Sequence, residues 1–105
     1  MAWIFLLTAG ALEIIWAAGL KRLGVSFSWN VTIVTVITMI ASLVALYAAM
    51  MRLPLGIAYP IWTVIGSIGS VIVSVMAFNQ TPSLSGVLGL ALLVIGMLLL
   101  GADAD

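Results

Sequence analysis

A single acidic residue, Glu13, interrupts the first apolar run of this sequence. The run extends from Ala2 to Leu20, and the first lysine or arginine is Lys21. A carboxylate in such a run has neither water nor a nearby cation, and an ionisable residue at membrane depth indicates a functional site. Desolvation favours the protonated acid over the carboxylate, so we expect Glu13 to alternate between holding a proton and holding a cation. The structural alternative is a permanently neutral acid that donates a hydrogen bond between helices.

Helical spacing places small and aromatic residues beside Glu13. Residues three and four apart share one side of a helix, which brings Gly10, Trp16 and Ala17 near the carboxylate. Gly10 and Ala17 leave room for a binding pocket or for a close helix crossing. The indole N–H of Trp16 could donate to Glu13, whereas packing within a helix bundle is its alternative role.

Two later segments carry residues that suit the same site. Ser42 lies near the middle of a stripe of small, weakly polar side chains and is the candidate partner of Glu13. Tyr59 and Trp62 lie about one turn apart further along; aromatic faces attract cations, and a tyrosine hydroxyl can donate to a carboxylate. Serine in membrane helices often bonds to its own backbone or joins helices, and aromatic rings also pack, so these structural roles stay open.

Glycines follow the candidate site along the third and fourth apolar segments. Gly66 and Gly69 lie on the same helix face as Tyr59 and Trp62, where they form either a conformational hinge or a groove for close packing. The fourth segment has no ionisable residue within its span, but Gly89 and Gly96 share one stripe. Small residues without polar partners mostly permit another helix to approach, so we predict that this stripe forms a dimer interface.

Membrane helices must position all of these residues. The chain has 105 residues, of which 66% are hydrophobic and only 6% charged, far outside the composition of soluble domains. A bilayer core needs roughly 20 apolar residues as a helix, and short polar or Gly/Pro-bearing connections separate the candidate runs. We therefore predict an all-α membrane protein with one domain, residues 1–105, of four transmembrane helices. The predicted helices span residues 2–20, 31–51, 57–78 and 84–102.

Composition also excludes several classes of function. Cysteine and histidine are absent, which removes disulfides, thiol chemistry, haem ligation and the usual zinc sites. We accordingly expect no metal, no cofactor and no enzymatic activity. The formal net charge is zero and no basic block occurs, so nucleic acid is not an expected partner. The first segment lacks the preceding basic region of a signal peptide and is expected to remain in the mature protein.

The loop charges give a weak signal for orientation. The first loop carries Lys21 and Arg22, the second carries Arg52 and the third carries no lysine or arginine, a bias of two against one. So small a difference does not fix a topology. The chain could insert in both orientations or pair with an oppositely inserted relative; alternatively, a small protein simply has few charges.

Together these motifs resemble the small multidrug resistance family, and within it the guanidinium exporters. The resemblance covers the whole chain and rests on "GALEIIWAAGLK" around Glu13, "LPLGIAYPIWTVIGSIG" in the third segment and the spaced glycines of the fourth. It implies a multi-pass protein of the bacterial inner membrane that works as an antiparallel dimer, either a homodimer or a heterodimer with a related chain. In such a dimer the two equivalent glutamates share one site and alternately bind protons or a cationic substrate.

The resemblance also implies roles for individual residues. Glu13 is the central carboxylate, and Tyr59 and Trp62 line the site. Trp16 and Ser42 match the positions that hydrogen-bond the glutamate in guanidinium exporters, whereas relatives that export bulky quaternary ammonium compounds usually have smaller residues there.

The third segment and the loop after it depart from the family pattern. Val64 stands where the family often has glycine, and Pro60 stands where it often has alanine, which alters the expected hinge. The loop "NQTPS" carries no charge, although the family usually has charge there.

The predicted function is proton-coupled antiport of guanidinium or small guanidyl cations. Four helices enclose little volume, so we expect the site to form only at a dimer interface near the midplane, with alternating access. Guanidinium is planar and rich in donors, which suits paired carboxylates. One alternative is proton-coupled export of hydrophobic quaternary ammonium cations, which carry no N–H and would depend on the aromatic rings. Another is a non-transporting membrane assembly subunit in which Glu13 only joins helices.

Overall fold

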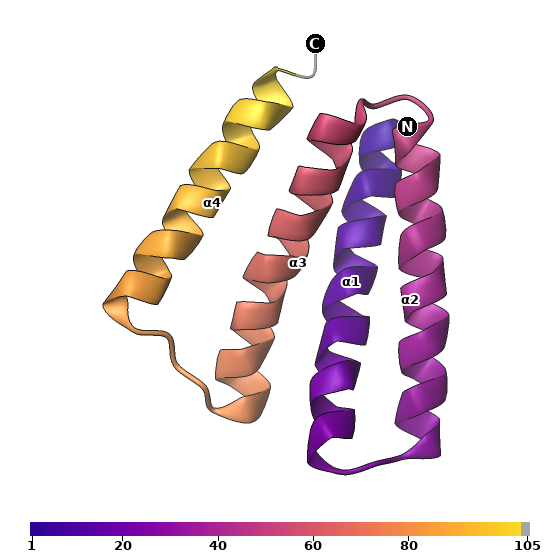
Figure 1. Ribbon diagram of the computed structural model, residues 1–105, viewed down its shortest axis with the longest axis vertical. Helices are drawn as coiled ribbons and strands as arrows, with labels where there is room; N and C mark the ends of the chain where they lie inside the picture. The colour runs from indigo at the N-terminus through magenta and orange to yellow at the C-terminus, as the bar shows by residue number, and fades with distance from the viewer. Residues whose placement is uncertain (104–105) are drawn as a thin grey trace.

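The computed structural model describes residues 1–103, which form four helices joined by short connections. The helices α1 (Ala2–Val25), α2 (Trp29–Met50), α3 (Leu55–Phe78) and α4 (Leu84–Ala102) run in alternating directions. The start of α1 and the end of α4 therefore lie at the same end of the molecule (Figure 1). Each helix is long and apolar enough to cross a membrane, which confirms the predicted all-α architecture with four membrane spans.

Three helices differ in their ends from the predicted spans. α1 continues through Lys21 and Arg22 to Val25 instead of ending at Leu20. α2 covers residues 29–50 rather than 31–51, and α3 begins at residue 55 rather than 57. Hydropathy marks the apolar core of the bilayer, whereas backbone hydrogen bonding carries a helix into the interface beyond it.

Capping residues turn the chain between α3 and α4. α3 ends at Phe78, and its C-cap Asn79 has a left-handed φ of 54°, a conformation that asparagine adopts more readily than most residues. The N–H of Gln80 then donates to the carbonyl of Ser74 at 3.0 Å, which folds the chain back over the end of α3. Ser83 is the N-cap of α4, and its hydroxyl oxygen accepts the Gly86 N–H at 3.3 Å.

The first three helices pack into a bundle with its core toward the end where α2 turns into α3. Small residues let these helices approach closely, because three alanines are completely buried between them. The core consists of Leu6, Ala9, Leu46, Ala49, Ile57, Ala58, Ile61 and Trp62. Toward the opposite end α1 and α3 diverge (Figure 1), which leaves space between their C-terminal halves.

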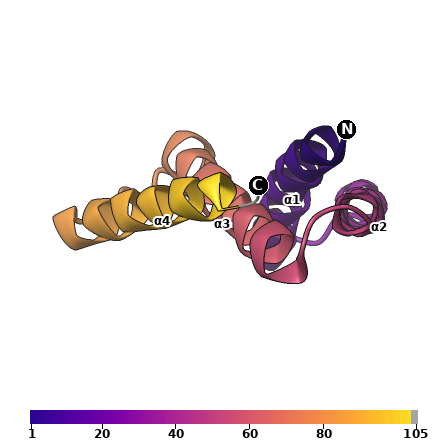
Figure 2. The ribbon, with the colours of Figure 1, turned by 90° about the horizontal axis from the view of Figure 1, so that it is seen from above.

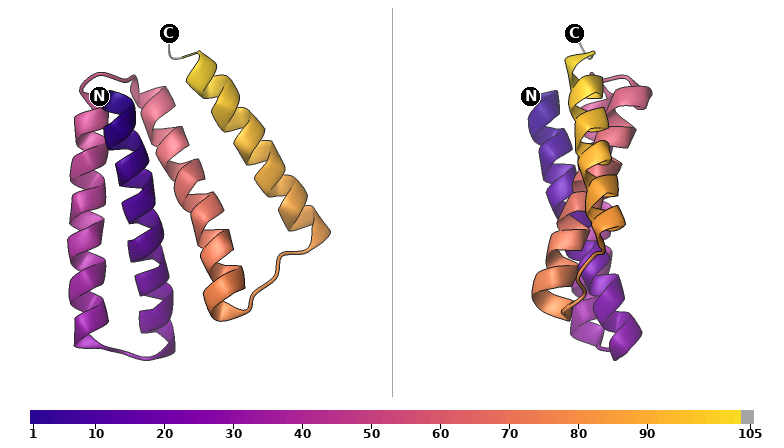
Figure 3. Two further views of the ribbon diagram at one scale, coloured as in Figure 1. Left: turned by 180° about the vertical axis from the view of Figure 1, so that it is seen from behind. Right: turned by 90° about the vertical axis from the view of Figure 1, so that its left-hand side faces the viewer.

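The fourth helix packs mainly against α3 and leans away from the bundle (Figures 2 and 3). None of its residues is buried, and the molecule measures only 16 Å along its shortest axis against 44 Å along its longest. A Cβ atom at Gly89 or Gly96 would meet no atom within 4 Å. The predicted association stripe is therefore open in a single chain.

Candidate functional site

Glu13 lies midway along α1, and its carboxyl group faces Gly66 of α3. A Cβ atom at Gly66 would overlap the carboxyl carbon and Oε1 of Glu13, so only glycine at this position leaves the carboxyl group where it is. Glu13 Oε1 is buried and has no hydrogen-bond partner among residues 1–103. The arrangement holds an unused acceptor at the depth where an ionised group is least stable.

The contact between α1 and α3 depends on glycine at several points. A Cβ at Gly69 would overlap the side chain of Ile14, just as a Cβ at Gly66 would overlap Glu13, and Gly10 of α1 makes a similarly close approach to α3. Gly66 and Gly69 are both buried within one continuous helix. They thus form a close-packing groove in this structure, one of the two roles that the sequence left open. Their role as a hinge stays a prediction.

Three helices are joined at one backbone carbonyl, a turn before Glu13. The hydroxyl of Ser42 donates to the Ala9 carbonyl at 2.7 Å. The indole N–H of Trp62 lies 3.2 Å from both this carbonyl oxygen and Ser42 Oγ. Helical geometry directs the Glu13 N–H to the same carbonyl, since each N–H donates to the residue four positions earlier. We call Ala9, Ser42 and Trp62 the Ala9 junction.

Ser42 therefore donates to Ala9, although the sequence nominated it as a partner of Glu13. The residue is completely buried, and it faces α1 one turn closer to the N-terminus than the carboxyl group. Its position along α2 predicts its depth in the membrane but not which group its hydroxyl meets. A bond from Ser42 to Glu13 stays a prediction that requires the hydroxyl to leave the Ala9 junction.

Trp16 and Tyr59 offer a donor and an aromatic surface. Trp16 Nε1 is buried without a hydrogen-bond partner among residues 1–103, and an indole N–H can only donate. An unused donor thus lies one helical turn from the unused acceptor of Glu13. The side chain of Tyr59 is 51% exposed, and its ring centroid lies 5.4 Å from that of Trp62 at a tilt of 44°. Tyr59 precedes Gly66 by seven residues on α3, about 10 Å along the helix axis, so its contact with a cation at Glu13 stays a prediction.

Two features of this site were missed by sequence reasoning. The role of Ala9 depends on a main-chain oxygen, which every residue has, so no residue type could signal it. Gly66 was interpreted as part of a hinge or of a packing groove. No pattern within α3 could signal that it leaves space for the Glu13 carboxyl group, because that depends on the register between α1 and α3. Among residues 1–103, no cluster of acidic residues could hold a metal ion.

Sequence comparison places these features in a known family. The family model for the Small Multidrug Resistance protein matches residues 1–93. The chain belongs to the small multidrug resistance family. Its relatives include guanidinium exporters of Yersinia pestis and Proteus vulgaris, each 41% identical over 98 residues, which are 93% of this chain and 94% of the relative. A guanidinium exporter of Salmonella typhi is 40% identical over 98 residues, or 93% of each chain.

Membership of the small multidrug resistance family agrees with the four apolar helices. The chain is a multi-pass integral protein of the bacterial inner membrane, as its membrane spans and its bacterial relatives indicate. The relatives are named exporters, and exporters are transporters rather than enzymes.

Proposed function

We propose that this protein exports guanidinium or small guanidyl cations in exchange for protons. Family membership supports the export of small cations, and relatives that cover nearly the whole chain are named guanidinium exporters. The observation that carries the proposal is the Glu13 carboxyl group, which sits against Gly66 at mid-helix with one oxygen buried and unpartnered. A purely structural acid would use that oxygen to join helices.

Proton and cation exchange follows from the two states of this carboxyl group. The protonated acid is neutral and stable in a poorly hydrated site, whereas the carboxylate requires a cation. Loss of the proton therefore creates the binding site, and return of a proton displaces the cation. Among residues 1–103, Glu13 is the only charged residue away from the helix ends and connections, so protons and the cation compete for the same carboxyl group.

Guanidinium matches the groups around Glu13. The cation is planar and presents N–H donors in a fork that suits carboxylates. Trp16 supplies a further N–H that can hold the carboxylate in place, and the exposed ring of Tyr59 can face the plane of the cation. Quaternary ammonium ions lack N–H groups, so they would use the rings and leave the carboxylate without hydrogen bonds.

We further propose that the functional unit is an antiparallel dimer. One chain presents a single carboxyl group, and its fourth helix has no buried residue. A second copy, or a related chain, inserted in the opposite orientation would bring two Glu13-type carboxylates to the midplane and cover the Gly89 and Gly96 stripe. Two such acids would titrate as a coupled pair, so their apparent proton affinities belong to the dimer.

Competition between protons and the cation sets the expected pH dependence. Each proton bound at the site opposes the cation, so affinity should fall as pH drops through the range in which Glu13 gains its proton. The slope should reach about ten-fold, or about 1.4 kcal/mol, per pH unit for each proton displaced. Guanidinium affinity measured from pH 5 to 9 provides the check. A pH-independent affinity would contradict competition at one site.

Transport by purified protein in liposomes separates this proposal from its alternatives. A gradient of guanidinium or of a small guanidyl cation should drive protons across the membrane in the direction opposite to the cation. A gradient of a quaternary ammonium ion should do so only weakly. Strong proton movement with quaternary ammonium ions alone would favour a multidrug exporter. No proton movement with either class, from folded protein in both homomeric and paired form, would favour a non-transporting subunit.

A further inference from the structure

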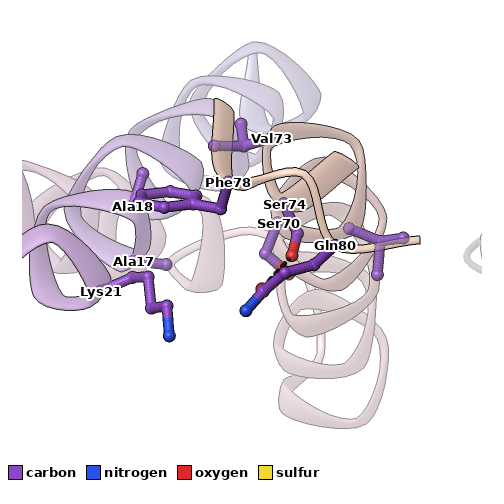
Figure 4. A pocket seen from close by; sticks show the side chains of 9 residues that line it. Ala17, Ala18, Lys21, Ser70, Val73, Ser74, Phe78 and Gln80 are labelled. Atoms are coloured by element: carbon purple, nitrogen blue, oxygen red, sulfur yellow. Dashed lines mark hydrogen bonds between the residues drawn. The ribbon is translucent and has the colours of Figure 1, made fainter. Parts of the chain in front are cut away.

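A groove of about 270 Å³ lies between the C-terminal halves of α1 and α3, outside the Glu13 site (Figure 4). It occupies the region where these helices diverge, near the end of the molecule that carries the first and third loops. Ala17 and Lys21 line it from α1, and Ser74 and Phe78 line it from α3. Gln80, just after α3, closes the rim.

The rim of the groove presents hydrogen-bond donors. The Ser74 hydroxyl donates to Gln80 Oε1 at 2.6 Å, and the backbone N–H of Gln80 donates to the Ser74 carbonyl at 3.0 Å. These two bonds fix the carboxamide with its oxygen engaged, so its NH₂ group is left as a donor. Figure 4 shows this nitrogen pointing from α3 toward the α1 side, where the Lys21 ammonium group lies. An ammonium group also only donates.

No carboxylate of the described residues neutralises this end of the molecule. Asp103 lies at the opposite end (Figure 1). Glu13 precedes Lys21 by eight residues on the same helix, a separation of about 12 Å along the axis. Lys21 and the adjacent Arg22 therefore form a local excess of positive charge, and Lys21 and Gln80 place two donors at the rim of the groove, a combination that selects an anion.

We propose that this groove binds the phosphate of an anionic phospholipid. Lys21 and Gln80 supply the donors for the phosphate oxygens, and charge-assisted hydrogen bonds to phosphate are among the stronger ones in proteins. Most of the remaining wall is apolar, with Ala17, Val73 and Phe78 available to the glycerol and upper acyl chain. Ser70 also lines it, but its hydroxyl already donates to the Ser67 carbonyl at 2.9 Å. Basic pockets between transmembrane helices at the interface are a known form of lipid headgroup site. A soluble phosphate would leave that apolar wall uncovered.

The proposed lipid site is separate from the Glu13 carboxyl group but adjoins it. Ala17 follows Glu13 by one turn on the same face of α1, so the groove opens just beyond the carboxyl group. Without an anion, the Lys21 charge opposes any cation that approaches from this end. A bound phosphate neutralises that charge without occupying the carboxyl group.

Native mass spectrometry of the full protein, released from detergent with defined lipids, tests the proposal. The parent should retain one phosphatidylglycerol per chain and retain phosphatidylcholine about ten-fold less. Lys21→Gln should lower phosphatidylglycerol retention about ten-fold, as expected for loss of one charged hydrogen bond. Gln80→Met should lower it several-fold while the charge is unchanged. Lys21→Arg keeps a cationic donor and should retain the lipid.

Arg22→Gln is the matched control, because it removes the same charge from the adjacent residue, which does not line the groove. Arg22→Gln should leave phosphatidylglycerol retention unchanged. If it lowers retention as much as Lys21→Gln does, general surface charge and not the groove holds the lipid, and the proposal is overturned. Equal retention of phosphatidylcholine would also overturn the proposal. If millimolar inorganic phosphate displaces the lipid, the groove is a site for soluble phosphate, and the proposal that a phospholipid occupies it is overturned. Lys21 and Gln80 are both exposed, so these variants should fold, which thermal unfolding of each sample checks.

Discussion

The first three helices and the fourth meet their neighbours in different ways. α1, α2 and α3 are joined by side-chain hydrogen bonds at the Ala9 junction and by glycine contacts that leave no room for a methyl group. α4 has no buried residue, and two of its glycines face open space. The Glu13 carboxyl group belongs entirely to the first region.

This difference indicates a division of roles. Close packing and interhelical hydrogen bonds hold Glu13 at a defined place, which a site for exchange requires. An open stripe of small residues holds nothing within one chain but admits another helix. Exchange should therefore respond to changes in the bundle, and association should respond to changes on α4.

The largest effect should come from Glu13→Gln. Glutamine keeps the shape and can still form hydrogen bonds, but it cannot exchange a proton or carry a negative charge. Proton-coupled guanidinium uptake into liposomes should fall to the level of empty liposomes, with dimer formation unchanged. Asp103→Asn removes the other described carboxylate and should retain full uptake. Proton-driven uptake by the Gln variant would refute the proposed mechanism.

Gly66→Ala should have the next largest effect. The added methyl group would overlap the Glu13 carboxyl group, which is the end of a flexible side chain and would have to move aside. Guanidinium affinity should therefore fall more than thermal stability in detergent. Gly56→Ala on the same helix is the control, since a Cβ there meets nothing within 4 Å. Similar losses from both variants would show that helix flexibility, and not space for the carboxyl group, is the property that matters.

Gly89→Leu and Gly96→Leu should separate association from folding. A Cβ at either position meets no atom within 4 Å, and Gly89 lines a hollow between α3 and α4, so we expect the thermal stability of the isolated chain to change little. The added bulk should weaken dimerisation about ten-fold by keeping the partner helix away. Ala91→Leu places the same bulk on the opposite face of α4. Unchanged crosslinking yields in both glycine variants would remove this stripe from the interface.

Ser42→Ala should have the smallest effect of the series. It removes the 2.7 Å bond to the Ala9 carbonyl, and interhelical hydrogen bonds in membranes contribute about 0.6 kcal/mol on average. Thermal unfolding in detergent should show a small destabilisation. Thr38→Ala is the control, because the Thr38 hydroxyl bonds within its own helix to Val34. A large loss of guanidinium affinity in Ser42→Ala, with stability unchanged, would instead favour direct contact between Ser42 and the Glu13 site.

Hydropathy was sufficient to predict the four helices, because a long apolar run has no other stable form in a bilayer. Spacing along one helix also predicted that Glu13 and Trp16 lie one turn apart. The bond from Ser42 to Ala9 could not be predicted, since it depends on how α2 is rotated against α1. The role of Gly66 depended in the same way on the register between α1 and α3, which a pattern within either helix does not contain.

The Ala9 junction has a consequence for how this site tolerates mutation. Its acceptor is a main-chain oxygen, so no substitution at position 9 can delete it, provided that the new side chain is small enough for a completely buried position. Its two side-chain donors come from different helices, and loss of one leaves the other bonded to the same atom. Genetic drift can therefore change the donors one at a time while the turn beneath Glu13 stays anchored. An anchor of this kind gives the carboxyl group a constant position in a lineage whose surrounding side chains vary.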